Sequence, residues 1–551
     1  MNLDREQQSG WKPLLFVFVG LVAVYCGWIL SLPLFPAQDS PMHLYIASVL
    51  SNLLSGSNHF SAYFYIRHLV TPYSLHYYFL IVFGRLFSFP IADKLLVCTV
   101  LVCSAFGFRY LALTIGPCGD LIALFAVPLL LSWALGMGFY NYCLSLGLAF
   151  WALGFWSRAG TRNSHTLWML FLATVSLMAI THPIPVVLVI VLCAMHVFWG
   201  IAQHRRRIST SAGNIIRPVT RFRWQMVYLL LASSTLVYIA HFAGSHAVAN
   251  EQHRAYDPVG AFAMIARAHY VSLFSGTRFI TQMERLSLYL LLIFAAFLAF
   301  QGYRERWRVR DSSFGDVLLT GAVLLVGVII FLPPNLHAVD AVTARLIWIV
   351  WLALLAASSG HTRFSAPRRK SVAITACLYA IAVLTLANVR IRPVAERIAT
   401  IENTPVVAGG LAGIGLQLPN RPVGQELSFH PYYWTTARYF RRADSTMLNS
   451  GWTYQDYIPV GSRSSTISSG LTPEIMGTPW MLEDMLLQSP SERQKIVGRS
   501  ELLVFVGYAK QPQEMLAEAY AVDRQEPQRA WNCLNHDWYF VCTTPKVRAG
   551  Q

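Results

Sequence analysis

The sequence predicts an all-α polytopic membrane protein with about 11–13 transmembrane helices, followed by a small C-terminal α+β extracytoplasmic domain. Only 13% of the 551 residues are charged, whereas soluble proteins carry about 25%. The mean hydropathy is +0.45, and long apolar runs recur from residue 11 to about residue 389. These observations exclude a soluble enzyme, a disordered chain and a fibrous protein.

Apolar runs near the length of a membrane span divide the first 390 residues. About 20 helical residues cross the hydrocarbon core of a bilayer. The first run, Leu14 to Leu32, is long enough to span and is not followed by a small-residue cleavage site, so we expect an uncleaved helix with a cytoplasmic N-terminus. The expected spans are 14–34, 74–90, 92–113, 120–137, 140–157, 165–181, 184–203, 224–243, 285–303, 314–332, 346–360 and 371–390.

Three basic clusters set the orientation. Residues 204–223, 303–311 and 361–370 are rich in arginine and lie between apolar runs, as cytoplasmic loops do. They place residues 244–284, residues 333–345 and the whole tail after residue 390 outside. An even number of spans from a cytoplasmic N-terminus would leave the tail inside, so one crossing between about residues 57 and 160 is miscounted. We therefore expect 11 or 13 spans.

Most of the net charge of +16 lies in these loops. In a soluble protein such a charge would indicate nucleic acid. Here it indicates topology and anionic lipid headgroups, so membrane lipid is a predicted partner and nucleic acid is not.

The chain divides into a transmembrane domain, residues 1–390, and an extracytoplasmic domain, residues 391–551. The second part has ordinary charge density, with strand-like runs at 501–507 and 538–542 and a helix-like run at 514–520. Cys533 and Cys542 flank a short segment there, and they are either a disulfide or a pair of free thiols. Six of the other seven cysteines lie in apolar runs and are read as small buried hydrophobes.

Asp39 is the only acid of the first outside loop. An amphipathic stretch, residues 44–54, follows it and is suited to the membrane interface. One interpretation is capping, because Asp before Ser-Pro is a good helix start. The other is a carboxylate that takes a proton from an acceptor hydroxyl. His43 falls four residues later, on the same helical face.

Arg345 lies near the start of a late span, where a charge is costly unless it is paired. Its planar donor fork suits a phosphate group. The alternatives are snorkelling or a salt bridge to Asp340. His337 lies in the same outside loop. In the loop 244–284, Arg267 and His269 are candidates for contacting a charged lipid and a sugar, and the alternative there is a solvated amphipathic loop.

Other chemistry has little support. Gly-rich phosphate loops, HExxH and GxSxG motifs are absent. No cysteine spacing indicates zinc or iron–sulfur, so we predict neither a metal site nor a cofactor. The aromatic run Phe429 to Trp434 suits sugar stacking, although aromatics more often build cores.

A first helix, an outside loop with Asp39 just past it, an interfacial helix, many further spans and an outside tail together resemble the GT-C superfamily of glycosyltransferases. The segment Gly136 to Tyr142 resembles a Gly-Phe-x-Asn-Phe-like element seen in such membrane proteins. The resemblance covers roughly residues 10–360. It implies a polyprenyl-phosphate-linked sugar donor, Asp39 as the catalytic carboxylate, Arg345 on the donor phosphate, and His43 as a polar partner of Asp39.

The expected function is therefore transfer of a sugar from a polyprenyl-phosphate donor to a glycan, lipid or protein acceptor of the cell envelope. The resemblance implies that transfer takes place on the outer face of the bacterial inner membrane. Two alternatives belong to other classes: a non-enzymatic membrane component of envelope assembly, and a transporter. A transporter favours ionisable groups at mid-membrane and repeated halves, and the sequence shows few such acids and no repeat.

Overall fold

The computed structural model describes most of the first half of the chain and parts of the rest. The described residues are 12–56, 58–208, 217–244, several positions between 290 and 304, 314–331, 342–360, 366–406, 410–417, 435–447, 459–462, 480–481, 502–506, 532–536 and 539–543. Everything below concerns these residues.

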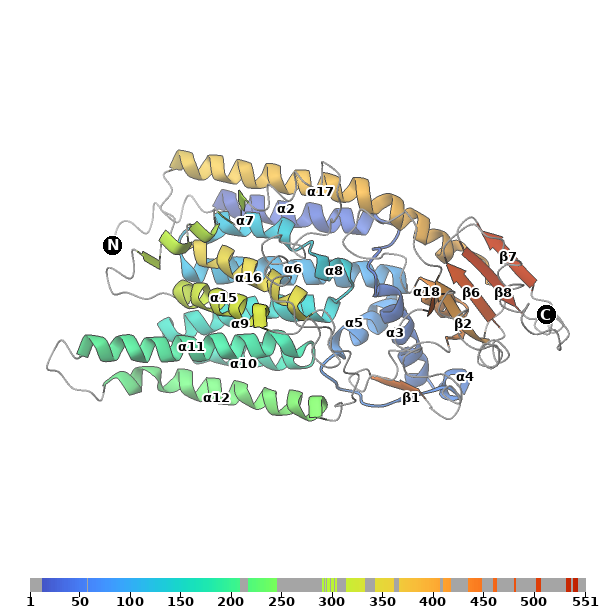
Figure 1. The fold of residues 1–551 in the computed structure, drawn as a ribbon, viewed down its shortest axis with the longest axis horizontal. Coiled ribbons are helices and arrows are strands. Elements are labelled where there is room, and N and C mark those ends of the chain that lie inside the picture. The colour runs from blue at the N-terminus through green and yellow to red at the C-terminus, as the bar shows by residue number, and fades with distance from the viewer. Residues whose placement is uncertain are drawn as a thin grey trace. The chain divides into compact units, whose positions relative to one another are not determined.

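Within the described residues, helices account for the apolar runs that the sequence predicts to be spans (Figure 1), and the predicted span 285–303 lies largely outside them. Seven of the described helices are long and apolar enough to cross a membrane. The chain is therefore an integral membrane protein with a polytopic helical part. The helices are α2 (Lys12–Ser31), α5 (Leu75–Leu86), α6 (Phe89–Ile115), α7 (Gly119–Leu129), α8 (Trp133–Gly136), α9 (Tyr140–Arg162), α10 (His165–Ala179), α11 (Pro183–Ile208), α12 (Arg217–Gly244), α15 (Phe314–Phe331), α16 (Val342–Ser358) and α17 (Ala366–Asn403).

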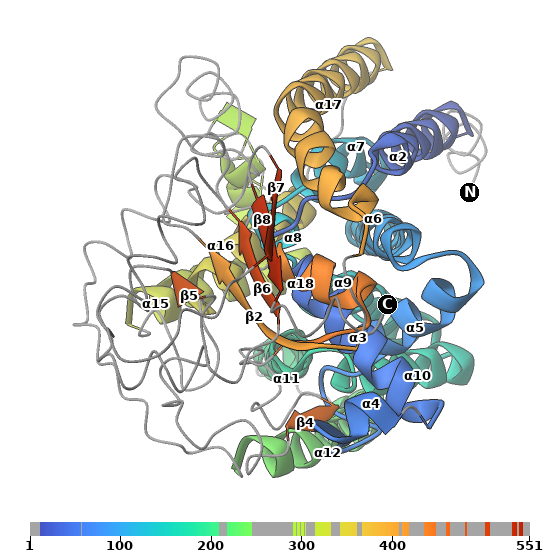
Figure 2. The ribbon, with the colours of Figure 1, turned by 90° about the vertical axis from the view of Figure 1, so that its right-hand side faces the viewer.

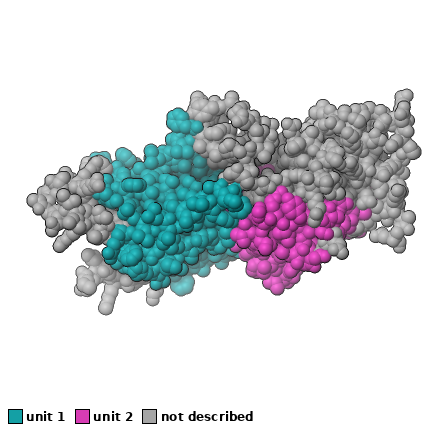
Figure 3. Space-filling model, turned by 90° about the horizontal axis from the view of Figure 1, so that it is seen from below, with its two compact units in different colours: residues 1–31, 97–135, 139–390 teal, residues 32–96, 136–138, 391–551 magenta. Residues whose placement is uncertain are grey.

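The chain forms two compact units (Figure 3). The first contains residues 1–31, 97–135 and 139–390, and the second contains residues 32–96, 136–138 and 391–551. The second unit thus gathers the first loop, a three-residue insert and the tail. The division into domains 1–390 and 391–551 remains a prediction.

Helix packing holds the first unit together. The helices α10, α11 and α12 lie side by side (Figure 1), and α15 packs on α16. A buried ion pair joins Arg109 Nε to Asp120 Oδ1 at 2.6 Å, with the Asp120 side chain 2% exposed. Because an unpaired charge is expensive among apolar helices, this pair explains why α7 tolerates an acid in its first turn.

The second unit combines short helices with β structure. Its helices are α3 (Ser40–Leu54), α4 (Asn58–Ser61) and α18 (Thr436–Arg442), together with α5. Helix α3 packs against both α5 and α18. A two-stranded antiparallel pair joins β1 (Phe64–Ile66) to β4 (Val460–Ser462), so the first loop and the tail share a ladder.

A six-stranded sheet is built from the tail (Figure 2). Its order is β3-β2-β6-β8-β7, with β5 also pairing with β2. Strands β3, β5 and β6 are parallel to β2, whereas β6, β8 and β7 run antiparallel to one another in turn. The strands are β2 (Ala412–Gln417), β3 (Thr446–Met447), β5 (Trp480–Met481), β6 (Leu502–Val506), β7 (Asn532–His536) and β8 (Tyr539–Thr543).

The sheet confirms the α+β character predicted for the tail. The two predicted strand runs coincide with β6 and β8, and the helix expected at 514–520 lies outside the described residues. Cys542 is disulfide-bonded, and the register of β7 and β8 places Cys533 opposite it. The free-thiol interpretation is therefore excluded for Cys542.

Candidate functional site

Asp39 occupies the N-cap position of α3, and its side chain makes no capping hydrogen bond. The residue is 7% exposed. Helix α3 starts at Ser40 with Pro41 in its first turn, as the sequence predicts. The capping interpretation therefore does not account for the carboxylate, although it predicts the helix start correctly.

The segment Gly136 to Gly138 holds the loop that carries Asp39. The backbone N–H groups of Gln38 and Asp39 donate to the carbonyls of Gly136 and Met137, at 2.9 and 3.0 Å. Gly138 has a φ of +86°, and a Cβ there would lie 3.0 Å from the backbone nitrogen of Asp39. Only glycine combines this backbone conformation with such a close approach. The Gly-rich element noted in the sequence thus forms a backbone clamp on the Asp39 loop.

His43 ties helix α3 to the same clamp. Its Nε2 lies 3.1 Å from the Gly138 carbonyl, which can only accept, so Nε2 carries the hydrogen. The other ring nitrogen, Nδ1, then accepts from His76 Nε2 at 3.1 Å or from the Tyr77 hydroxyl at 3.2 Å. Burial lowers the pKa of His43 to about 3, opposed by the hydrogen bond to Gly138. The ring is neutral at physiological pH, and it orients the turn below Asp39.

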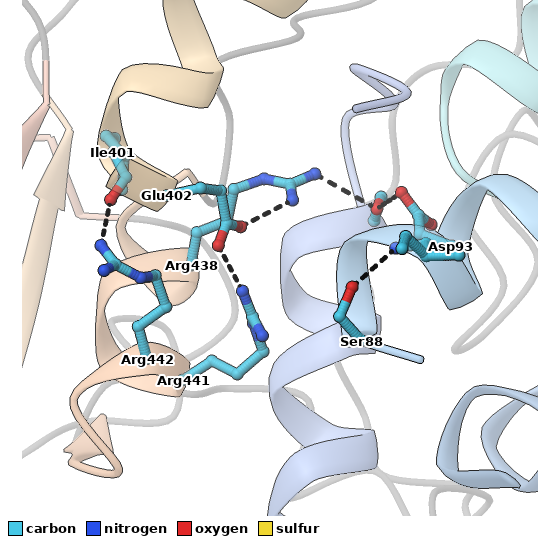
Figure 4. Close-up of polar contacts among 9 residues, drawn as sticks. Ser88, Asp93, Ile401, Glu402, Arg438, Arg441 and Arg442 are labelled. Carbon is cyan, nitrogen blue, oxygen red and sulfur yellow. Dashed lines mark hydrogen bonds and ion pairs between the residues drawn. The ribbon is translucent and has the colours of Figure 1, made fainter. Parts of the chain in front are cut away.

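Ser40 connects the Asp39 loop to a buried charge network, of which Figure 4 labels Asp93, Arg438 and Glu402. Its hydroxyl donates to Asp93 Oδ2 at 2.8 Å and accepts from Arg438 Nη2 at 3.5 Å. Arg438 Nη1 donates to Glu402 Oε1 at 3.1 Å, and Arg441 Nη2 donates to Glu402 Oε2 at 2.5 Å. The network therefore joins the first loop, the start of α6, the end of α17 and α18.

Arg345 lies in the first unit, in the first turn of α16, and is 7% exposed. Its guanidinium carbon stands 3.9 Å from the centroid of the Phe139 ring and 5.6 Å from that of Tyr142. Such cation–π contacts stabilise a desolvated guanidinium. The Tyr142 hydroxyl donates to the backbone carbonyl of Arg345 at 2.7 Å, which fixes the start of the helix.

His182 faces this arginine, and the tautomer of its ring determines whether the nitrogen nearest the guanidinium donates or accepts. Arg345 Nη1 lies 3.1 Å from His182 Nε2, while the backbone N–H of Ile184 donates to His182 Nδ1 at 3.2 Å. A neutral imidazole has one acceptor nitrogen, so with Nδ1 accepting, Nε2 carries a hydrogen directed at the guanidinium. Burial, followed by the charge of Arg345, holds the pKa of His182 well below its usual value. The arrangement presents two donors that one anionic oxygen would satisfy.

The structure brings together Asp39 and His43 in the second unit and places Arg345 in the first. His337, Asp340, Arg267 and His269 lie outside the described residues. Sequence reasoning did not identify His76, Asp93 and Arg438 as neighbours of the Asp39 loop, nor His182 as a neighbour of Arg345. Among the described residues, no three His, Cys, Asp or Glu side chains form a group that could hold a metal ion.

Comparisons with known proteins identify the fold. No protein-family model matches the chain, and no curated protein matches it in sequence. The chain is similar to ArnT from Cupriavidus metallidurans in the apo state, with a TM-score of 0.53, 12% identity and coverage of 97% of this chain and 98% of that one. ArnT from the same organism bound to undecaprenyl phosphate gives a TM-score of 0.49 with 14% identity over the same shares of the two chains.

An oligosaccharyltransferase from Archaeoglobus fulgidus in the apo form gives a TM-score of 0.45 with 10% identity, over 89% of this chain and 69% of that one. These identities are too low to transfer an activity, and the likeness to apo ArnT concerns the fold over nearly the whole length of both chains. The fold of this chain is therefore similar to that of apo ArnT, and this likeness agrees with the resemblance to GT-C glycosyltransferases seen in the sequence.

Proposed function

We propose that this protein is a GT-C glycosyltransferase, which moves a sugar from a polyprenyl-phosphate donor to a glycan, lipid or protein acceptor of the cell envelope. Transfer takes place on the outer face of the bacterial inner membrane, with the tail on that side. The observation that carries the proposal is Asp39: a carboxylate that does not cap its helix, on a loop held at its backbone by the 136–138 clamp. Preorganisation of this kind is what a catalytic group needs.

In this reaction Asp39 is the general base. It takes the proton of the acceptor hydroxyl while that oxygen forms a bond to the anomeric carbon of the donor sugar. The bond between the anomeric carbon and the phosphate oxygen breaks, and polyprenyl phosphate leaves with the bonding electron pair. The protonated Asp39 later returns its proton to water.

Arg345 and His182 hold the donor phosphate. An oxygen of the leaving group gains negative charge during transfer, and fixed donors directed at that oxygen lower the barrier. The guanidinium and the Nε2 of His182 lie 3.1 Å apart, close enough for both groups to donate to one phosphate oxygen. Phe139 keeps the guanidinium in place from one face.

The test compares variants of the full-length protein in lipid nanodiscs. The donor is a polyprenyl-phosphate sugar fraction extracted from host membranes, and the readout is release of polyprenyl phosphate that depends on added envelope acceptor. Asp39→Asn removes the base without changing size, and we expect at least a 100-fold loss of turnover. Asp316→Asn is the matched control, because Asp316 is also buried in a first helical turn, in α15.

We expect Asp316→Asn to retain activity within about twofold, because the carboxylate of Asp316 has no role in the proposed reaction. Wild-type turnover in the Asp39→Asn protein would refute the role of Asp39. Absence of acceptor-dependent release in the wild type with every donor fraction would favour the non-enzymatic or transport alternatives, and uptake of the donor across sealed vesicles would separate those two.

A further inference from the structure

We propose that Arg438, from the C-terminal part of the chain, is a positioning residue for the loop that carries Asp39, acting through the Ser40 hydroxyl. The inference rests on the proposed function for its kinetic consequence, whereas its structural consequence is independent of any activity. Ser40 is the residue directly after Asp39, and Arg438 lies 398 residues further along the chain.

The Ser40 hydroxyl has a settled role in the network. It has one hydrogen, which it donates to Asp93 Oδ2 at 2.8 Å, so towards Arg438 Nη2 it can only accept. Cation, hydroxyl and carboxylate therefore form a directed chain that ends on helix α6. Because Ser40 is completely buried, water cannot replace either partner at low cost.

Arg438 is an unusual side chain to bury. It is 0% exposed and among the largest fully buried side chains of the described residues. A buried guanidinium costs several kcal/mol of desolvation, and its partner Glu402 is shared with Arg441. If the arginine served only to fill space, an apolar side chain would do so without the free-energy cost of desolvating a charge. The position instead uses the two separate terminal nitrogens of arginine, one on Glu402 and one on Ser40 (Figure 4).

The same loop is held from its other side by the clamp at residues 136–138, through backbone bonds to Gln38 and Asp39. Two restraints on adjacent residues, one on the backbone of Asp39 and one on the side chain of Ser40, leave the intervening peptide little freedom. This is how a second layer of residues fixes a catalytic group within a few tenths of an ångström. Loss of either restraint should loosen the carboxylate without removing it.

The first experiment measures amide hydrogen exchange by mass spectrometry in nanodiscs, without substrate. We expect Ser40→Ala and Arg438→Met to accelerate exchange in a peptide covering residues 36–44 by about tenfold or more, which corresponds to the loss of about 1.4 kcal/mol of protection. Ser48→Ala is the matched control, because Ser48 is a buried serine of the same helix, about two turns beyond Ser40. Unchanged exchange in both variants would overturn the inference.

The second experiment separates positioning from a merely structural role. We expect Ser40→Ala and Arg438→Met to lower kcat about tenfold or more while the KM for the donor stays within twofold. Arg438→Lys, which keeps the charge and one contact, should recover part of kcat. Variants with a lowered melting temperature but wild-type kcat at a permissive temperature would contradict positioning.

The outcomes distinguish this inference from the proposed function. If Asp39→Asn retains full activity, the proposed function fails, while the exchange result still decides whether Arg438 orders the loop. If Asp39→Asn is inactive and the Ser40 and Arg438 variants behave as wild type in both experiments, the function stands and the positioning role is refuted. Ser40→Ala removes a single oxygen, so this variant still tests the inference if Arg438→Met does not fold.

Discussion

Gly138→Ala is the sharpest test of the clamp on the Asp39 loop. At a φ of +86° an alanine is strained, which costs about 1–2 kcal/mol. Its Cβ would also lie 3.0 Å from the backbone nitrogens of Asp39 and Ser40. Because these are backbone atoms, relief requires the loop to move away from its partners at residues 136–138.

The displacement has a calculable cost. Moving the loop weakens the hydrogen bond from the Asp39 N–H to the Met137 carbonyl and the one from His43 to the Gly138 carbonyl. Each such bond contributes about 0.5–1.5 kcal/mol. With the backbone strain, we expect a local destabilisation of about 2–5 kcal/mol for Gly138→Ala and a matching loss of activity.

Gly56 supplies the matched control for this prediction. Its φ is +79°, and nothing lies within 4 Å of a Cβ built there, so Gly56→Ala carries the backbone strain without the steric contact. We expect about 1–2 kcal/mol for it and no effect on turnover. The assay is hydrogen exchange of residues 36–44 together with thermal melting in nanodiscs. Equal effects of the two substitutions on that segment would refute the clamp.

Low pH, the substitution Arg345→Lys and reduction of the disulfide should each affect one defined residue or bond. The pKa of folded His43 is about 3, below its usual 6.5, so the unfolded chain takes up the proton first as pH falls. The free energy of unfolding should therefore decline by about 1.4 kcal/mol per pH unit below about pH 6.5. If the melting temperatures of wild type and His43→Asn change in parallel between pH 7 and 4.5, this prediction is contradicted. Arg345→Lys keeps the charge but loses the planar fork, so the KM for the donor should rise about tenfold or more, and an unchanged KM would contradict phosphate binding. Reduction of the disulfide at Cys542 should lower the stability of the six-stranded sheet by about 2–4 kcal/mol, seen as earlier melting with dithiothreitol; melting that is unaffected would contradict it.

The helical part could be predicted from the sequence because its signal is local. Runs of apolar residues at span length must be helical, since no other open structure satisfies the backbone in lipid. The predicted span 140–157 falls within α9, and 184–203 falls within α11. Helix α17 runs on to Asn403, past the predicted end at residue 390, because helix formation does not stop where the apolar run does.

The candidate site was predictable only in part. Asp39 stands out because it is a lone acid in its loop, and Arg345 because it is a charge entering an apolar helix. Arg438 gave no such signal: it lies in a segment of ordinary charge density, and only the fold reveals that it is buried against a loop nearly 400 residues away. The contact between His182 and Arg345 gave no sequence signal for a similar reason, since the two residues lie 163 positions apart.

The contact between the two ends of the second unit has a consequence for how the protein is made. Ser40 accepts a hydrogen bond from Arg438, and the Tyr45 hydroxyl accepts one from the backbone N–H of Met447, from residues 398 and 402 positions further on. At about 5–20 residues per second, a ribosome reaches those partners roughly 20–80 s after it has synthesised the first loop. During that interval the early segment is inserted beside its membrane anchor without its later neighbours. Nascent chains released before residue 438 should therefore be recognised by quality-control proteases as unfinished, even though every preceding span is in place.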